Sequence, residues 1–278
     1  MKIPDFPGLK EWKVAWPDRV QHSKTYRKAD GFKDQNVLLI GAGVSAMDIG
    51  REISSVAKNV YQSVRGSAFD IPIQLLGPTV QRVAEISSFS LPTQNQANPG
   101  PIMLKDGRVL ENIDRVILCT GYHHTLPFLS QFHGNSIPVQ EADDRILVTD
   151  GTQVHNLHKD IFYIPDPTLA FVGIPYYTAT FTFFEYQAIA VAAVFSGKAW
   201  LPSEEEMRRV YAEKVGRKGY GRGFHSLKDE DLMYVEEIRA WLNGCAEVTG
   251  RPKVEGYGER WWRGLEERKV RMEKLLGL

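Results

Sequence analysis

The sequence has little that would indicate a secreted, metal-binding or nucleic-acid-binding protein. Its 278 residues include only two cysteines, Cys119 and Cys245, with no C-x-x-C or metal-ligand spacing. This argues against a disulfide framework and favours a reducing, cytoplasmic setting. The 34 Lys and Arg residues balance the 34 Asp and Glu residues, so no excess charge indicates a nucleic-acid partner. His155 and His158 could suggest a metal pair, but no third ligand is near them, and no metal is expected.

The sequence also lacks a long uninterrupted hydrophobic run. Its most apolar stretch, residues 168–195, is broken by Gly173 and Pro175 and contains Glu185. Membrane-spanning helices are continuous and nearly free of charge. We therefore expect no membrane span, and we interpret the stretch as a buried strand, a turn and a buried helix over 183–195.

What the sequence does contain is a strand, a glycine turn, a helix and a second strand in direct succession. The run Asn36–Ile40 (NVLLI) is typical of a strand that is buried on both faces. Residues 44–57 place apolar side chains at helical spacing, and residues 59–64 form the second short strand. The segment 41–46 (GAGVSA), between the first strand and the helix, fits the pattern G-x-G-x-x-A.

The small residues of this turn suit a dinucleotide phosphate site. Gly41 permits the tight turn, Gly43 lets a pyrophosphate approach the backbone, and Ala46 lets the helix pack close to the strand. Free N–H groups at the helix start, with the positive end of the helix dipole, would hold the phosphates. The alternative is a glycine-rich turn without a nucleotide, but the strand–turn–helix context favours binding. The residues expected to contact the cofactor here are Gly41, Ala42, Gly43, Val44, Ser45 and Ala46.

The end of the second strand favours NADP(H) over NAD(H). NAD sites place a carboxylate about 20 residues beyond the glycine motif, where it binds the ribose 2′-OH. This chain has residues 61–66 (YQSVRG) at that place, without an acid. Ser63 and Arg65 are expected on the same side of the strand, and a guanidinium pairs with a 2′-phosphate that a carboxylate would repel. The alternative for Arg65 is an ordinary surface arginine at a strand end.

Patterns are weaker elsewhere. Residues 1–35 are predicted to be an irregular segment, and Asp106-Gly107 is predicted to turn a hairpin. Gly244 is read as a helix stop. Further strands are expected at 115–119, 161–164 and 169–172, and further helices after the capping box 203–206, over 229–242 and over 259–276.

Several segments together resemble the flavin-containing monooxygenase family. Residues 16–26 (WPDRVQHSKTY) resemble its fingerprint F-x-G-x-x-x-H-x-x-x-Y/F, with matches at His22 and Tyr26 and departures at Trp16 and Asp18. Further resemblance lies in 6–8 (FPG), 119–122 (CTGY, similar to the family's A-T-G-Y) and 197–202 (GKAWLP), so that it covers residues 4–202.

The resemblance implies an FAD- and NADPH-dependent monooxygenase that oxygenates a nucleophilic nitrogen or sulfur atom of a small molecule. It places Thr120 at the cofactor and gives His22 a structural rather than an acid–base role; no catalytic residue is assigned. The family's first glycine fingerprint, which holds FAD, is not found in this sequence. The chain is therefore expected to be truncated, to have its FAD site completed by a partner chain, or to have its tail repacked over the gap. Two alternatives stay open: a non-catalytic NADPH-binding module or partner subunit, and a different NADPH oxidoreductase.

The predicted fold class is α/β. It comprises a Rossmann-like NADPH-binding domain over residues 1–125, the C-terminal part of a flavin-binding domain over 126–202, and a helical C-terminal tail over 203–278.

Overall fold

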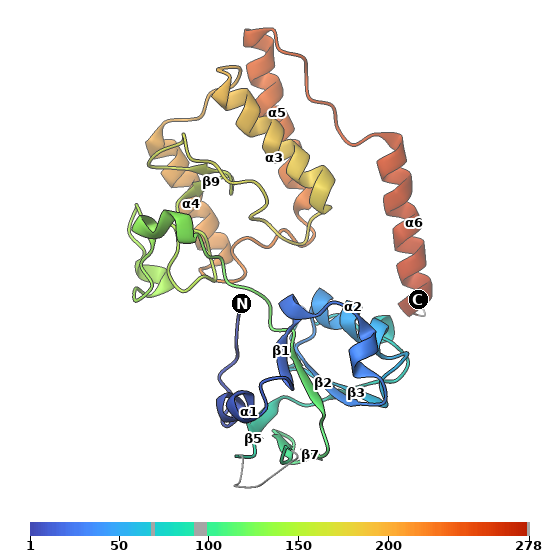
Figure 1. Cartoon of the computed structure of the whole chain (residues 1–278). Coiled ribbons are helices and arrows are strands. Elements are labelled where there is room, and N and C mark those ends of the chain that lie inside the picture. Colours follow the sequence, from blue (N-terminus) through green and yellow to red (C-terminus); the bar gives the residue numbers. More distant parts are fainter. Residues whose placement is uncertain (68–69, 92–98, 277–278) are drawn as a thin grey trace. The chain divides into compact units, whose positions relative to one another are not determined.

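The computed structural model describes residues 1–67, 70–91 and 99–276. It divides into two compact units, residues 1–122 with 265–278, and residues 123–264. Figure 1 shows the helices and strands of each unit. The predicted α/β class is confirmed.

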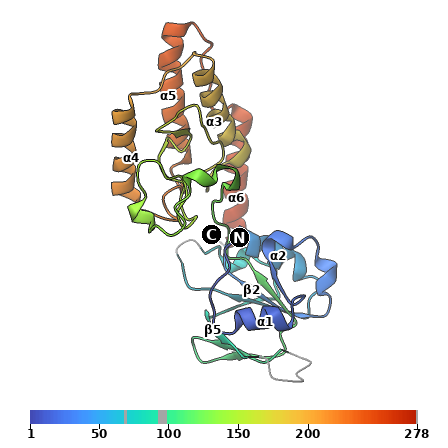
Figure 2. The same cartoon turned by 60° about the vertical axis from the view of Figure 1, so that its left-hand side comes forward.

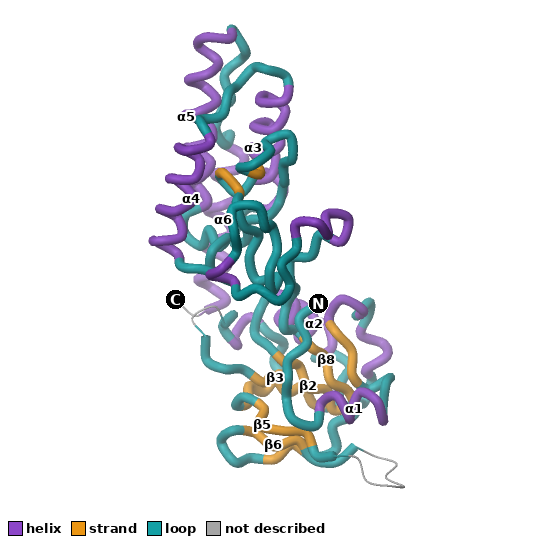
Figure 3. Tube along the Cα trace, turned by 90° about the vertical axis from the view of Figure 1, so that its left-hand side faces the viewer, coloured by secondary structure: helices purple, strands orange, loops and turns teal. Residues whose placement is uncertain are grey.

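The first unit is built on a five-stranded parallel sheet. Its strand order is β1-β8-β2-β3-β4, and every neighbouring pair is parallel. The strands are β1 (Val20–His22), β2 (Asn36–Ile40), β3 (Asn59–Ser63), β4 (Val80–Val83) and β8 (Arg115–Leu118). The central strand, β2, therefore has β3 on one side and β8 on the other (Figure 3).

Alternate residues of β2 enter two different cores. Val37 and Leu39 pack with α2 (Val44–Ile53) on one face of the sheet. Leu38 and Ile40 pack on the other face, with α1 (Leu9–Ala15) and the antiparallel strands β5 (Ile86–Phe89), β6 (Ile102–Leu104) and β7 (Val109–Leu110). Figure 2 shows α1 beside β5. Burial on both faces explains why β2 reads as a continuous apolar run. Short 3-10 helices are η1 (Ser23–Thr25), η2 (Ala29–Phe32) and η3 (Ile73–Leu75).

The second unit consists mainly of helices and loops (Figure 3). In its core α3 (Thr180–Phe195) packs against α5 (Asp231–Thr249). The short hairpin β9 (Leu157–His158) and β10 (Phe162–Tyr163) is antiparallel. The remaining elements are η4 (Pro127–Phe132), η5 (Val139–Glu141) and α4 (Glu204–Lys218). Helix α6 (Glu259–Leu276) begins in this unit, and its residues from 265 onward are grouped with the first unit. In the described ranges no helix is both long and apolar enough to cross a membrane.

The structure confirms the predicted strand–turn–helix–strand unit, the hairpin at Asp106-Gly107 and the helix after Ser203. The Ser203 hydroxyl accepts a hydrogen bond from the Glu206 N–H at 3.3 Å, as a capping box requires. Three predictions are wrong. Residues 1–35 are not irregular throughout, because they contain α1 and β1. Residues 169–172 form no strand, and Ala170 makes only an isolated bridge to Phe162.

The predicted helix stop at Gly244 is also wrong. Helix α5 continues through Gly244 and ends at Gly250, which is left-handed with φ 66°. A glycine inside a helix costs only about 1 kcal/mol relative to alanine. The residues that follow, Cys245 and Ala246, are 3% and 4% exposed, and burying them favours another turn of helix.

Candidate functional site

The glycine turn lies at the carboxyl end of β2, where the sheet order reverses. The strands β3 and β8 follow later in the chain and flank β2 on opposite sides. In open α/β sheets, ligands bind at such a switch point, outside the carboxyl ends of the strands. The predicted turn 41–46 therefore lies where the topology favours a ligand.

Gly41 is required by the fold itself. Its φ is +117°, which side-chain-bearing residues rarely adopt. A Cβ atom at this position would also lie 2.5 Å from the Cys119 carbonyl oxygen. The first glycine thus allows the turn to pass close to the end of β8.

At Gly43, by contrast, neither the backbone conformation nor a close contact within the described residues requires glycine. Its φ is −87°, and a Cβ atom built on it would meet no described atom within 4 Å. The backbone at Gly43 is exposed, so the space beside it is free for a ligand. This is the position at which the sequence predicted close approach of a pyrophosphate.

Helix α2 presents its N-terminus at the same place. Gly43 is the N-cap, and the first turn contains no acidic residue. The first N–H groups of a helix have no partner within it, so those at Val44 and Ser45 are available to an anion. Ala46 is fully buried against the sheet, as close helix packing requires.

A side-chain pair that the sequence analysis did not mark supports the turn. Gln62 on β3 is fully buried, and its Nε2 donates a hydrogen bond to the Gly41 carbonyl at 3.1 Å. Arg82 on β4 donates to Gln62 Oε1 from Nε and Nη2, at 3.1 and 3.0 Å. These two residues lie opposite each other in the parallel register, but 20 residues apart in sequence, so no local motif reveals them.

The two residues predicted at the nucleotide 2′ position differ in their surroundings. Ser63 is 3% exposed, and its hydroxyl donates to the Ala84 carbonyl at 3.0 Å. Arg65 is exposed, and its side chain makes no hydrogen bond or ion pair with the residues that the structure describes. Of the two, only Arg65 has a side chain that is free to meet a ligand.

The segment that follows β8 is tied to the N-terminal residues. The Thr120 hydroxyl donates to the Lys2 carbonyl at 2.5 Å, and the Lys2 N–H donates to the Gly121 carbonyl at 3.0 Å. His22 accepts the Lys24 N–H at Nδ1 (3.1 Å), so its Nε2 carries the proton that it donates to Gly121 at 3.1 Å. Burial lowers the pKa of His22, although its bond to Gly121 opposes the shift. A neutral imidazole with a hydrogen bond at each ring nitrogen fits the structural role expected for His22.

The second unit contains a buried charged network. Asp160, 1% exposed, accepts hydrogen bonds from Lys214 Nζ at 2.6 Å and contacts His225 Nδ1 at 2.9 Å. Burial alone would raise the pKa of Asp160, but His225 and Lys214 together hold it well below its usual range. Lys159 and Asp160 both have positive φ, 52° and 57°, in the turn between β9 and β10. The Tyr234 hydroxyl donates to the Lys159 carbonyl at 2.5 Å, so α4 and α5 both hold this turn.

The histidines considered as a metal pair are buried rather than arranged as ligands. His155 contacts the Thr149 hydroxyl at 3.2 Å and the Tyr211 hydroxyl at 3.5 Å. Neither ring nitrogen of His158 has a hydrogen-bond partner in the described part of the chain. Burial lowers the pKa of each histidine to about 4. Within the described ranges, no three His, Cys, Asp or Glu residues could hold a metal ion together.

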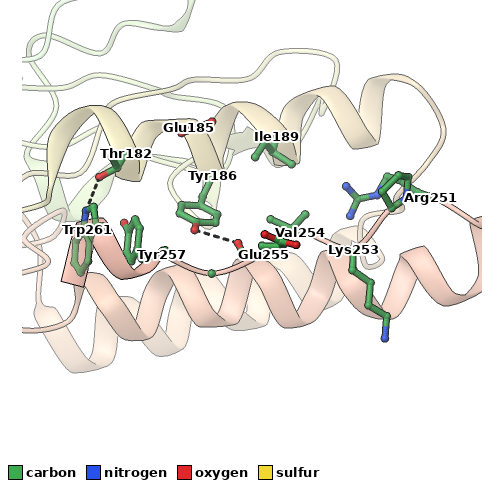
Figure 4. Close-up of a pocket in the computed structure, with 13 residues that line it drawn as sticks. Thr182, Glu185, Tyr186, Ile189, Arg251, Lys253, Val254, Glu255, Tyr257 and Trp261 are labelled. Carbon is green, nitrogen blue, oxygen red and sulfur yellow. Dashed lines mark hydrogen bonds between the residues drawn. The ribbon is translucent and has the colours of Figure 1, made fainter. Parts of the chain in front are cut away.

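A cavity of about 610 Å³ lies in the second unit, between α3 and the segment before α6 (Figure 4). At one end the Tyr257 and Trp261 rings stack with centroids 3.8 Å apart, and Trp261 Nε1 donates to the Thr182 hydroxyl at 3.1 Å. The Tyr186 hydroxyl donates to the Glu255 carbonyl at 3.1 Å. None of the predicted cofactor residues lines this cavity.

Comparison with known proteins gives consistent matches to one family. A family model described as flavin-binding monooxygenase-like matches residues 1–73 and 92–250. The chain is 44% identical over 272 residues to the flavin-containing monooxygenase ustF2 of Aspergillus flavus, with 95% of this chain and 55% of that protein covered. It is 32% identical to the flavin-containing monooxygenase iboF of Amanita muscaria, with 91% and 50% covered.

Solved structures agree. The S-allyl-L-cysteine S-oxygenase of Allium sativum superposes with a TM-score of 0.66 at 26% identity, with 99% of this chain and 56% of that chain covered. Tmm of a Pelagibacter species gives a TM-score of 0.61 at 22% identity, with 92% and 50% covered, which shows likeness of fold. The chain thus spans about half the length of the relatives it matches.

Proposed function

Because the chain belongs to the flavin-binding monooxygenase-like family, we propose that its first unit binds NADPH at the turn 41–46. The observation that carries this proposal is the open backbone at Gly43, beside the uncapped N-terminus of α2. The turn lies at the switch point of a parallel sheet, where N–H groups and the helix dipole favour a pyrophosphate. Gly41, Ala42, Gly43, Val44 and Ser45 would surround it, with Ala46 holding the helix close.

In the same proposal, Arg65 binds the 2′-phosphate of the nucleotide. Its guanidinium is exposed and unpaired within the described residues, and Arg65 is the second residue after β3. The segment 61–66 contains no carboxylate to repel that phosphate. Ser63 and Thr120 would act beside the cofactor through the backbone they fix, since both hydroxyls donate within the fold.

The described residues offer FAD no phosphate-binding turn comparable to the one at 41–46. In the described ranges, the turn after β2 is the one glycine turn that links a parallel strand to a helix, and it is assigned to NADPH. We propose that another polypeptide segment, such as one from a partner chain, supplies the FAD phosphate site. The side chain of Phe181 on α3, 89% exposed, supports an apolar surface that this polypeptide would cover.

The activity we propose for the complete protein is oxygenation of a nitrogen or sulfur atom of a small molecule, dependent on NADPH and FAD. The flavin-containing monooxygenases among its relatives support the monooxygenase class, and its likeness to the S-allyl-L-cysteine S-oxygenase of Allium sativum supports a sulfur acceptor. A second candidate is a non-catalytic NADPH-binding module, which is favoured because the described residues have one glycine turn from a parallel strand into an α-helix.

Nucleotide titration tests the site, and absorbance tests whether this chain alone holds FAD. We expect the full chain to bind NADPH more tightly than NADH, and Arg65→Ala to weaken NADPH binding about tenfold or more while leaving NADH binding unchanged. Arg51→Ala, at an exposed arginine on α2, is the matched control. Equal affinity of the unaltered chain for both nucleotides would contradict the role of Arg65.

The absorbance test incubates the chain with FAD and removes unbound flavin. Retained flavin colour that bleaches with NADPH and returns in air would support the monooxygenase. A colourless chain that still binds NADPH would mean that this chain alone is an NADPH-binding module, as expected if another polypeptide supplies the FAD phosphate site.

A further inference from the structure

We infer that Gln62 and Arg82 are positioning residues that aim the N–H groups of the 41–43 turn at the bound nucleotide. The inference rests on the proposed NADPH site and deepens it. Neither side chain is assigned a contact with the nucleotide; both act through the backbone of Gly41 and Ala42.

The first step is the orientation of the Gln62 amide. This side chain is fully buried, so its amide must find partners inside the fold. A guanidinium has donors and no acceptor, so the two hydrogen bonds from Arg82 fix the amide oxygen on the Arg82 side. The amide nitrogen is thereby turned to the Gly41 carbonyl. Without Arg82, the amide could turn its oxygen toward that carbonyl, and two acceptors would face each other.

The second step is a further carbonyl held by the same guanidinium. Arg82 Nη2 also donates to the Ile71 carbonyl at 2.6 Å. The Ile71 N–H in turn donates to the Ala42 carbonyl at 2.9 Å. Arg82 therefore supports the hydrogen bonds to two consecutive carbonyl groups. It supports that of Gly41 through Gln62 and that of Ala42 through Ile71.

The third step follows from the planarity of the peptide bond. In a trans peptide the C=O and the next N–H point in opposite directions. Anchoring the Gly41 carbonyl directs the Ala42 N–H away from Gln62, and anchoring the Ala42 carbonyl directs the Gly43 N–H away from Ile71. Neither N–H donates to another group among the described residues. Two successive N–H groups without a partner among the described residues are available to an anion.

Arg65 and Arg82 would therefore have different effects on nucleotide binding. Arg65 would distinguish NADPH from NADH, because only NADPH carries the 2′-phosphate. Arg82 would affect both nucleotides equally, because both carry the pyrophosphate that the turn receives.

The experiment titrates the full chain with NADPH and with NADH by calorimetry, and records thermal unfolding of each variant. For Arg82→Met we expect both affinities to fall by a similar factor, about tenfold, which corresponds to one hydrogen bond to a charged group. Arg82→Lys keeps the charge, and its ammonium has three N–H donors, so it can replace the single Nη2 atom that donates to both Gln62 and Ile71. We therefore expect it to recover much of the binding that Arg82→Met loses. Arg51→Met, on the exposed face of α2, should bind both nucleotides like the unaltered chain.

Two results would overturn the inference. One is unaltered affinity of Arg82→Met for both nucleotides. The other is a loss confined to NADPH, which would make Arg82 a 2′-phosphate contact. If Arg82→Met does not fold, Gln62→Leu decides, because undiminished binding of both nucleotides by that variant contradicts the positioning role. Failure of the unaltered chain to bind either nucleotide would instead refute the proposed function itself.

Discussion

Protonation of His158 should destabilise the second unit in mild acid. His158 is 3% exposed, and neither ring nitrogen has a hydrogen-bond partner in the described part of the chain. Burial lowers its pKa from 6.5 to about 4; Lys159 adds to this shift and Glu206 opposes it. The folded protein therefore keeps His158 neutral at a pH at which an unfolded chain would protonate it.

The size of the effect follows from the two pKa values. Between pH 6.5 and 4 the unfolded state binds more protons, so the free energy of unfolding falls as the pH falls through this window. The slope approaches about 1.4 kcal/mol per pH unit for one histidine. Relative to pH 8, His158 should lower the free energy of unfolding by about 2 kcal/mol at pH 5.

Urea unfolding at steps between pH 8 and pH 5, followed by tryptophan fluorescence, tests this. Trp241 reports on the region, because its ring lies 6.3 Å from the ring of Phe162, the cross-strand neighbour of His158. His158→Leu should remove about 2 kcal/mol of the pH 5 loss. Phe162→Leu, the control, should lower stability by the same amount at every pH. A His158→Leu variant that keeps the full pH slope would refute the reasoning.

Two further predictions concern the turn and the buried network. Gly41→Ala should lower the thermal midpoint strongly, because its Cβ would lie 2.5 Å from the Cys119 carbonyl oxygen, whereas Gly43→Ala should keep the midpoint and weaken NADPH binding. Equal midpoints for the two variants would contradict this division. Lys214→Met should destabilise the second unit by about 3 kcal/mol or more, because it removes a partner of the buried Asp160, and calorimetric melting that shows no change would contradict it.

The strand–turn–helix unit could be predicted because its information is local. The run Asn36–Ile40 is apolar throughout since β2 is covered on both faces, and the glycines follow at once. The family resemblance rested on similarly short segments, and the comparisons confirm it. The assignment of cofactor contacts to individual residues stays a prediction.

The remaining features depend on contacts between distant parts of the chain. Gln62 and Arg82 become partners only when β3 and β4 pair in register. Strand β1 was missed because a three-residue strand has too few residues to show a period, and it exists through pairing with β8. The burial of Cys245 and Ala246, which continues α5 past Gly244, likewise becomes visible only in the packed core.

The turn at Lys159 and Asp160 also has a consequence for the order in which the second unit can assemble during synthesis. The Asp160 carboxylate leaves the ribosome 54 residues before Lys214 and 65 residues before His225. Until then, closing the hairpin into a core would bury an uncompensated charge, which is strongly unfavourable. We therefore expect the turn to be buried only after the C-terminal helices have been made, so that the core around Asp160 forms late in synthesis.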